Sequence, residues 1–77
     1  MSVFYAEFRE DNATTYSGMF STYDKAVGFV LRIAETFDIS LDTITPKNSM
    51  FPTTNFVYFD NEDYGAFISE YVVDEDC

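Results

Sequence analysis

No histidine occurs among the 77 residues, and the one cysteine is Cys77, the last residue. Histidine is the commonest general base and metal ligand near neutral pH, so an active site or metal site built on imidazole is excluded. A single cysteine can close no internal disulfide and form no cysteine-rich zinc site. The sequence therefore excludes a disulfide-stapled secreted scaffold, and we expect no cofactor.

Basic residues are also scarce, with 4 Lys and Arg against 14 Asp and Glu, which gives a formal net charge of -10. An anionic surface repels nucleic acid and anionic lipid alike, so direct binding to either is disfavoured. No apolar run approaches the ~18–20 residues that cross a bilayer, and the first seven residues contain no signal peptide. We expect a cytoplasmic protein that binds no membrane.

What the chain does contain is enough apolar material to fold. Hydrophobic residues make up 47% of it and aromatic residues 19%, whereas disordered segments are poor in both. Its length fits one small domain. We predict a single domain over residues 1–77, with residues 73–77 as a frayed acidic tail.

Alternation of apolar and polar residues predicts an N-terminal hairpin. In residues 3–9, Phe4, Ala6 and Phe8 form one apolar face of a strand. Residues 14–20 predict a second, weaker strand, and the polar residues between the two predict a turn.

A helix follows. The segment from Ser21 to Asp24 fits a capping box, a Ser or Thr followed three residues later by an acid. From Tyr23 to about Phe37 the polar residues fall within an arc of roughly 120° at 100° per residue. The remaining arc is apolar and wide enough to lie across a small sheet.

The second half of the chain predicts two more strands. Residues 38–55 contain two prolines and no clear period, so we expect a long surface connection. Residues 56–59 and 64–73 read as strands joined by a four-residue hairpin loop. The order strand, strand, helix, strand, strand predicts an α+β two-layer sandwich, a four-stranded antiparallel sheet with one helix packed on a face. The two hairpin loops would lie at one end if both open the same way.

The acids are concentrated toward the end of the sequence. After Lys47 there is no basic residue, and from residue 60 onward there are seven acids, which are Asp60, Glu62, Asp63, Glu70, Asp74, Glu75 and Asp76. A further cluster near the first hairpin consists of Glu7, Glu10 and Asp11. Acids two apart on an extended strand lie ~6.8 Å apart on one side, a spacing comparable to that of successive phosphates. Solvated surface is the alternative reading, but the net charge exceeds the roughly 2–8 usual for small domains.

Catalysis and metal binding are poorly supported. Paired carboxylates can act as acid and base in hydrolases, but here they lie on a loop and a tail with no evident cleft. The segment Asp60 to Asp63 has neither the glycine nor the final glutamate of a calcium loop. We expect no enzyme activity and no bound metal.

The last two strands carry large apolar residues on both faces, for example Phe56 and Tyr58 against Val57 and Phe59. The second face of the sheet is therefore not fully solvated, and either residues 38–55 or a partner covers it. That partner could be a second copy of the chain, so a homodimer is one of the alternatives.

With its size, charge and absence of catalytic residues, the chain resembles small acidic phage-encoded inhibitors of host defence. These are nucleic-acid mimics of the anti-restriction, anti-CRISPR and uracil-DNA glycosylase inhibitor types, and the segment from Met19 to Ala26 looks like a strand-to-helix turn seen in many small phage proteins. The resemblance implies an inhibitor that acts in the host cytoplasm on a nucleic-acid-binding host protein. The resemblance concerns the class, size and charge of the protein, and it gives no functional role to any particular residue.

The leading hypothesis is that the acids named above occupy a basic nucleic-acid channel, with exposed Tyr58, Tyr64 or Tyr71 adding short-range specificity. One alternative is an adaptor that binds a host enzyme through an aromatic sheet face. Another is a homodimeric structural protein whose acidity serves solubility.

Overall fold

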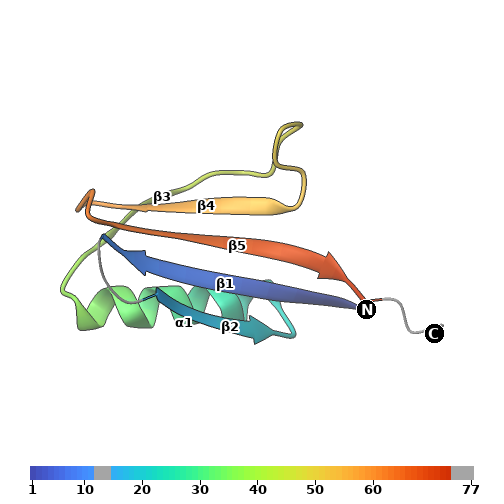
Figure 1. Ribbon diagram of the computed structural model, residues 1–77, viewed down its shortest axis with the longest axis horizontal. Coiled ribbons are helices and arrows are strands. Elements are labelled where there is room, and N and C mark those ends of the chain that lie inside the picture. The colour runs from blue at the N-terminus through green and yellow to red at the C-terminus, as the bar shows by residue number, and fades with distance from the viewer. Residues whose placement is uncertain (12–14, 74–77) are drawn as a thin grey trace.

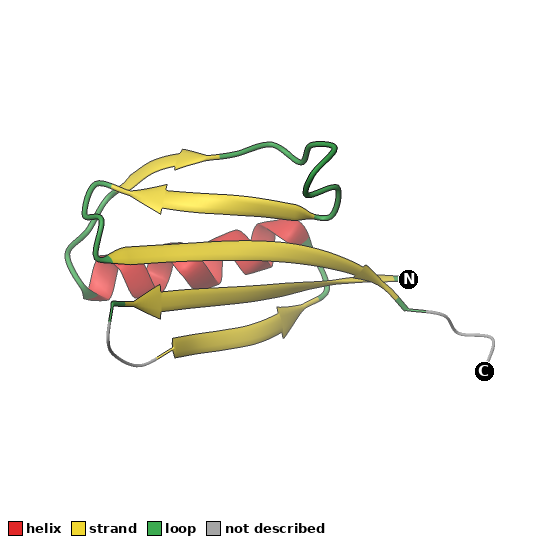
Figure 2. Cartoon of the chain, turned by 45° about the horizontal axis from the view of Figure 1, so that its top comes forward, coloured by secondary structure: helices red, strands yellow, loops and turns green. Residues whose placement is uncertain are grey.

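The computed structural model describes residues 1–11 and 15–73. Within them, five strands form one antiparallel sheet, and the helix α1 (Tyr23–Thr36) packs on one of its faces (Figures 1 and 2). The strands are β1 (Ser2–Glu10), β2 (Thr15–Phe20), β3 (Leu41–Ile44), β4 (Thr54–Phe59) and β5 (Tyr64–Val72). Their order in the sheet is β2-β1-β5-β4-β3. The predicted α+β two-layer class is confirmed, but the predicted number of four strands is wrong.

The additional strand is β3, which lies in the segment predicted to be irregular. It pairs with β4, with a register shift between Leu41 and Thr43. The pairing is extended on both sides, because the N–H of Thr45 donates to the carbonyl of Phe56 at 2.8 Å and the N–H of Asp60 donates to that of Ser40 at 3.0 Å. A four-residue edge strand with mostly exposed side chains leaves little periodicity in a sequence. β3 is recognised as a strand by its backbone pairing with β4 and not by a pattern in the sequence.

The two predicted hairpins are confirmed. β1 pairs with β2, and β4 pairs with β5 across the loop of residues 60–63. In the centre of the sheet Ala6 lies opposite Gly18 on one side and Ile68 on the other. Ala6 and Phe8 are buried in one cluster with residues of α1, and Phe4 packs against that cluster, so the apolar face predicted from the alternation points toward α1.

The helix begins one residue later than the capping-box reading implies. Thr22, with φ -137° and ψ 156°, is the N-cap, and its hydroxyl accepts a hydrogen bond from the N–H of Lys25 at 3.2 Å. The hydroxyl of Ser21 instead accepts from the side-chain amine of Lys25 at 3.4 Å. After the helix, Asp38 has a positive φ of 56°. That left-handed residue turns the chain away from the helix axis toward β3.

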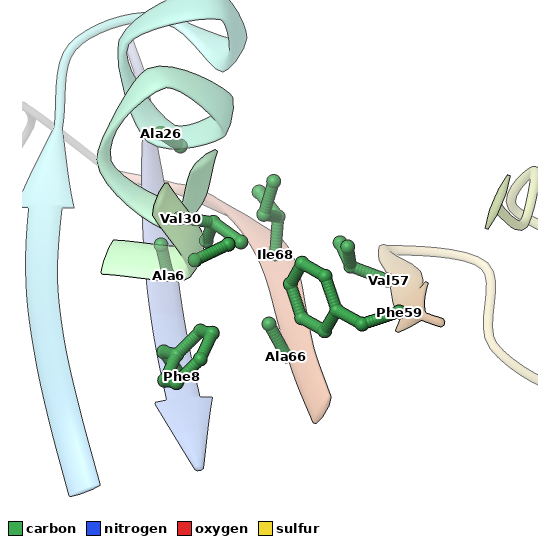
Figure 3. Packing of buried hydrophobic residues seen from close by; sticks show 9 residues of the cluster. Ala6, Phe8, Ala26, Val30, Val57, Phe59, Ala66 and Ile68 are labelled. Atoms are coloured by element: carbon green, nitrogen blue, oxygen red, sulfur yellow. The ribbon is translucent and has the colours of Figure 1, made fainter. Parts of the chain in front are cut away.

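The core lies between α1 and the sheet (Figure 3). On α1 the buried residues are Ala26, Val30 and Ala34, spaced four apart along one face. On the sheet Phe8 is fully buried, and its ring centroid lies 5.4 to 5.9 Å from three other aromatic rings, those of Phe37, Phe59 and Tyr64. Burial of a large apolar side chain contributes about 1.5–3 kcal/mol. This cluster therefore fixes the helix against the sheet and leaves the other face of the sheet uncovered by α1.

Candidate interaction surface

Six acids from the end of β1 and from the segments after β1, α1 and β4 gather at one end of the molecule, the left end in Figure 1. We call this group the acidic end, and its members are Glu10, Asp11, Asp38, Asp60, Glu62 and Asp63. The N–H of Asp11 donates to the carbonyl of Asp63 at 2.8 Å and so ties the end of β1 to the β4–β5 loop. The two hairpin loops thus lie at the same end of the sheet, which the sequence left conditional.

The β4–β5 loop has an internal scaffold. The side-chain oxygen of Asn61 accepts from the N–H of Asp63 at 2.9 Å, and a carboxylate oxygen of Asp60 accepts from the N–H of Ser40 at 3.0 Å. These bonds hold residues 60–63 in a turn. The predicted hairpin loop is therefore present, and the spacing considered for acids on an extended strand does not apply to Asp60 and Glu62.

Glu70 belongs elsewhere. It lies near the opposite end of β5, where the amine of Lys47 donates to its carboxylate at 2.7 Å. This hydrogen bond lowers the pKa of Glu70 below its ordinary value. The acids of residues 60–73 are thus divided between two ends of the molecule, and Glu70 among them is paired with a basic residue from the 45–53 loop. Asp74, Glu75 and Asp76 lie outside the described residues.

Glu7 lies on the face of the sheet turned away from α1, which we call the open face. The hydroxyl of Tyr5 donates to one carboxylate oxygen of Glu7 at 2.7 Å, and the guanidinium of Arg9 donates to the other. The Tyr5 bond, followed by Arg9, lowers the pKa of Glu7, and the same bond raises the pKa of Tyr5. The Glu7 side chain is only 12% exposed. It therefore acts within the sheet and does not extend the acidic end.

The three tyrosines predicted to be exposed differ in position. Tyr58 and Tyr71 are 50% and 52% exposed and lie on the open face. Tyr64 does not fit the prediction, because it is half-buried on the other face, with its ring tilted against those of Phe8 and Phe37 at centroid distances of 5.9 and 5.4 Å. The available signal was the alternation along β5, which places Tyr64 on the same face as the buried Ala66 and Ile68.

The open face is hollowed beside the acidic end. A groove of about 460 Å³ lies over Gly65, between Arg9 of β1 and Tyr58 of β4, which flank Gly65 in the sheet register. Phe56 and Phe67 form its other apolar walls, and Glu62 of the acidic end also lines it. Sequence reasoning missed this groove. A glycine within a strand was the available signal, since such a position often marks close approach of another group.

Phe51 covers one corner of the open face. Its ring meets that of Phe56 edge-on, with centroids 4.8 Å apart. Part of the segment 38–55 therefore packs on this face, which was one of the two predicted ways of covering it. Tyr58 and Tyr71, by contrast, keep about half of their surface exposed.

Within residues 1–11 and 15–73, no group of three or more acidic, cysteine or histidine side chains is arranged to hold a metal ion. Within the same residues, no helix has the length and apolar character to cross a membrane. No protein-family model matches the chain, and no curated protein or solved structure matches it either.

Proposed function

We propose that the protein is a non-enzymatic inhibitor whose acidic end occupies the basic nucleic-acid site of a partner protein. The observation that carries this proposal is the gathering of six carboxylates, from the end of β1 and the segments after β1, α1 and β4, at one end of the sheet. Rows of phosphates attract proteins through the same long-range field. A fixed cluster of carboxylates would be steered into a basic groove in the same way.

The acidic end suits this role because the β4–β5 loop is held by hydrogen bonds to its backbone. Asp11 and Asn61 fix the path of the β4–β5 loop. Binding through a pre-organised surface costs less conformational entropy than binding through a flexible tail. The resemblance to phage-encoded inhibitors supports a host defence or DNA-processing protein as the partner.

The test is competition with nucleic acid. The protein, immobilised through Met1, is exposed to a bacterial lysate at low and high salt, and the retained proteins are identified by mass spectrometry. We expect a nucleic-acid-binding protein that is released by salt and displaced by a DNA or RNA oligonucleotide.

A charge-matched pair of variants separates local from overall charge. Glu62→Gln with Asp63→Asn and Ser49→Lys with Met50→Lys each change the formal net charge from -10 by two units, to -8. The first pair alters the acidic end and the second alters the exposed 45–53 loop. We expect the first pair to weaken binding to the captured protein at least about tenfold, since lost charge pairs cost over 1.4 kcal/mol together. Equal effects of the two pairs would refute nucleic-acid mimicry at this end.

The groove over Gly65 favours a second candidate, an adaptor that binds a host enzyme through the open face. In that case the captured protein would resist high salt, and nucleic acid would not displace it. Substitution of Tyr58, which is 50% exposed beside the groove, would then weaken binding more than the changes at Glu62 and Asp63.

A further inference from the structure

The backbone at Gly65 does not itself require glycine. Its φ is not positive, and a Cβ added there would meet no atom within 4 Å. Gly18 is different, because a Cβ at that position would lie 3.0 Å from the ring of Phe20. Glycine within a strand weakens it through chain entropy. At Gly65 the missing side chain leaves the floor of the groove open.

The walls of the groove are apolar and partly fixed in place. The guanidinium carbon of Arg9 lies 5.9 Å from the centroid of the Phe67 ring, and the same guanidinium is bound to Glu7. Tyr58 forms the opposite side and is half exposed. A volume of about 460 Å³ falls within the range of ligand sites, roughly 300–1,000 Å³, and is ample for one large side chain.

The groove and the acidic end share a border. Glu62 lines the groove, and it also lines the hollow formed with Asp60 and Asp63. Arg9 and Gly65 lie between the groove and the surface of Glu10 and Asp11. A segment lying across this border would therefore meet an apolar hollow and carboxylates side by side.

We infer that the groove over Gly65 receives a large apolar side chain from a partner segment that carries arginine or lysine next to it. The basic residues would face Glu62 and Asp63, while the apolar side chain would rest on Gly65 between Tyr58 and Phe67. Charge complementarity with a chain of net charge -10 selects a basic segment over a neutral or acidic one. This inference rests on the proposed function and names the feature of the partner that would give specificity.

The probes are synthetic peptides titrated into the isotope-labelled protein and followed by amide NMR. One peptide is arginine-rich with a central leucine, a second has serine in place of leucine, and a third keeps the leucine but replaces the arginines by serine. The chain has 3 glycines, Gly18, Gly28 and Gly65, whose amides serve as reporters in and away from the groove. We expect the first peptide to shift the Gly65 amide and to bind about tenfold more tightly than the second, from burial of one leucine.

Two leucine substitutions provide the matched variants. Gly65→Leu fills the groove, whereas Gly28→Leu adds the same side chain to α1, and in neither place would a Cβ meet an atom within 4 Å. We expect Gly65→Leu to abolish the preference for the leucine peptide and Gly28→Leu to retain it. The comparison of the first two peptides on the unsubstituted protein stays informative even if one variant folds poorly.

The outcomes separate the inference from the proposed function. Equal binding of the two arginine-rich peptides, weakened by Glu62→Gln with Asp63→Asn, would overturn the groove inference and leave the acidic end in its proposed role. A leucine preference at Gly65, with an affinity for the arginine-rich peptides that those two substitutions do not lower, would support the groove and contradict the proposed function. Binding of the third peptide as tightly as the first would overturn the requirement for a basic segment. A concentration-dependent dimer in sedimentation, lost in Gly65→Leu, would assign the groove to a second copy and overturn the inference.

Discussion

The N–H of Asp11 donates to the carbonyl oxygen of Asp63 at 2.8 Å, and this bond joins the ends of two hairpins that are far apart in the sequence. It brings like-charged residues together, which electrostatic repulsion opposes. The backbone bond and the Asn61 turn beside it must offset that repulsion. The hydrogen bonds of the fold therefore hold the carboxylates of the acidic end together despite their mutual repulsion.

The Asn61 side chain should matter for stability although it is exposed. Replacing it by alanine removes the acceptor for the N–H of Asp63. We expect Asn61→Ala to lower the free energy of unfolding by about 1 kcal/mol, measured by urea denaturation. Glu62→Ala in the same loop is the control and should leave stability unchanged or raise it, because it removes only repulsion.

Glu7 should give the protein a pH-dependent stability. Because the Tyr5 hydroxyl and Arg9 lower the pKa of Glu7 in the folded state, folding favours the ionised form. That contribution is present above the unfolded pKa and is lost as pH falls through the folded pKa. We expect Glu7→Gln to cost about 1 kcal/mol at neutral pH, with the difference from the unsubstituted protein shrinking as the pH falls below about 4.3.

Thermal unfolding from neutral to acidic pH measures that difference. Glu62→Gln, which changes the net charge equally at an exposed side chain, is the control for general repulsion. A stability difference for Glu7→Gln that stays constant with pH would contradict the role assigned to the ionised carboxylate.

Two neighbouring hydroxyls, those of Ser21 and Thr22, are candidates for the N-cap of α1. Because the Thr22 side chain accepts from the N–H of Lys25, Thr22→Ala should lower stability by about 1 kcal/mol, and Thr22→Ser should restore most of it. Ser21→Ala should have little effect, since its hydroxyl meets only the flexible amine of Lys25. Denaturant midpoints of the three variants check this, and a larger loss for Ser21→Ala would restore the capping-box reading.

Phe8 should be among the most sensitive positions of the core. It is 0% exposed and contacts aromatic rings from α1's C-terminal end, β4 and β5. We expect Phe8→Ala to cost about 3–5 kcal/mol, a large part of the roughly 5–15 kcal/mol typical of small domains. Val72→Ala, at a residue that is 80% exposed, should change stability by no more than about 0.5 kcal/mol. Calorimetry of both variants measures the contrast.

The elements that could be predicted from the sequence are those with strong periodicity. The alternation at Phe4, Ala6 and Phe8 placed β1 and its buried face, and the polar arc of α1 placed the helix. β3 could not be predicted, because Leu41–Ile44 is an edge strand whose existence depends on pairing with β4. Local pattern carries no information about such a partner.

The candidate surface was predictable in composition but only partly in arrangement. The sequence located the acids, yet distance along the chain did not reveal that Lys47 binds Glu70, 23 residues away. Likewise Glu7 looked like a surface acid and is held by Tyr5 and Arg9. These pairings depend on strand order and loop path, which only the folded chain defines.

The start of β1 and the end of β5 lie together, and this has a practical consequence. The N–H of Val73 donates to the carbonyl of Met1 at 2.7 Å, so both lie together at the end of the sheet opposite the acidic end (Figure 1). A sensor chip, a bead or a dye coupled at Met1 would therefore be held away from the carboxylates. Every molecule attached in this way would present the acidic end outward in the same orientation, so one uniform binding phase is expected.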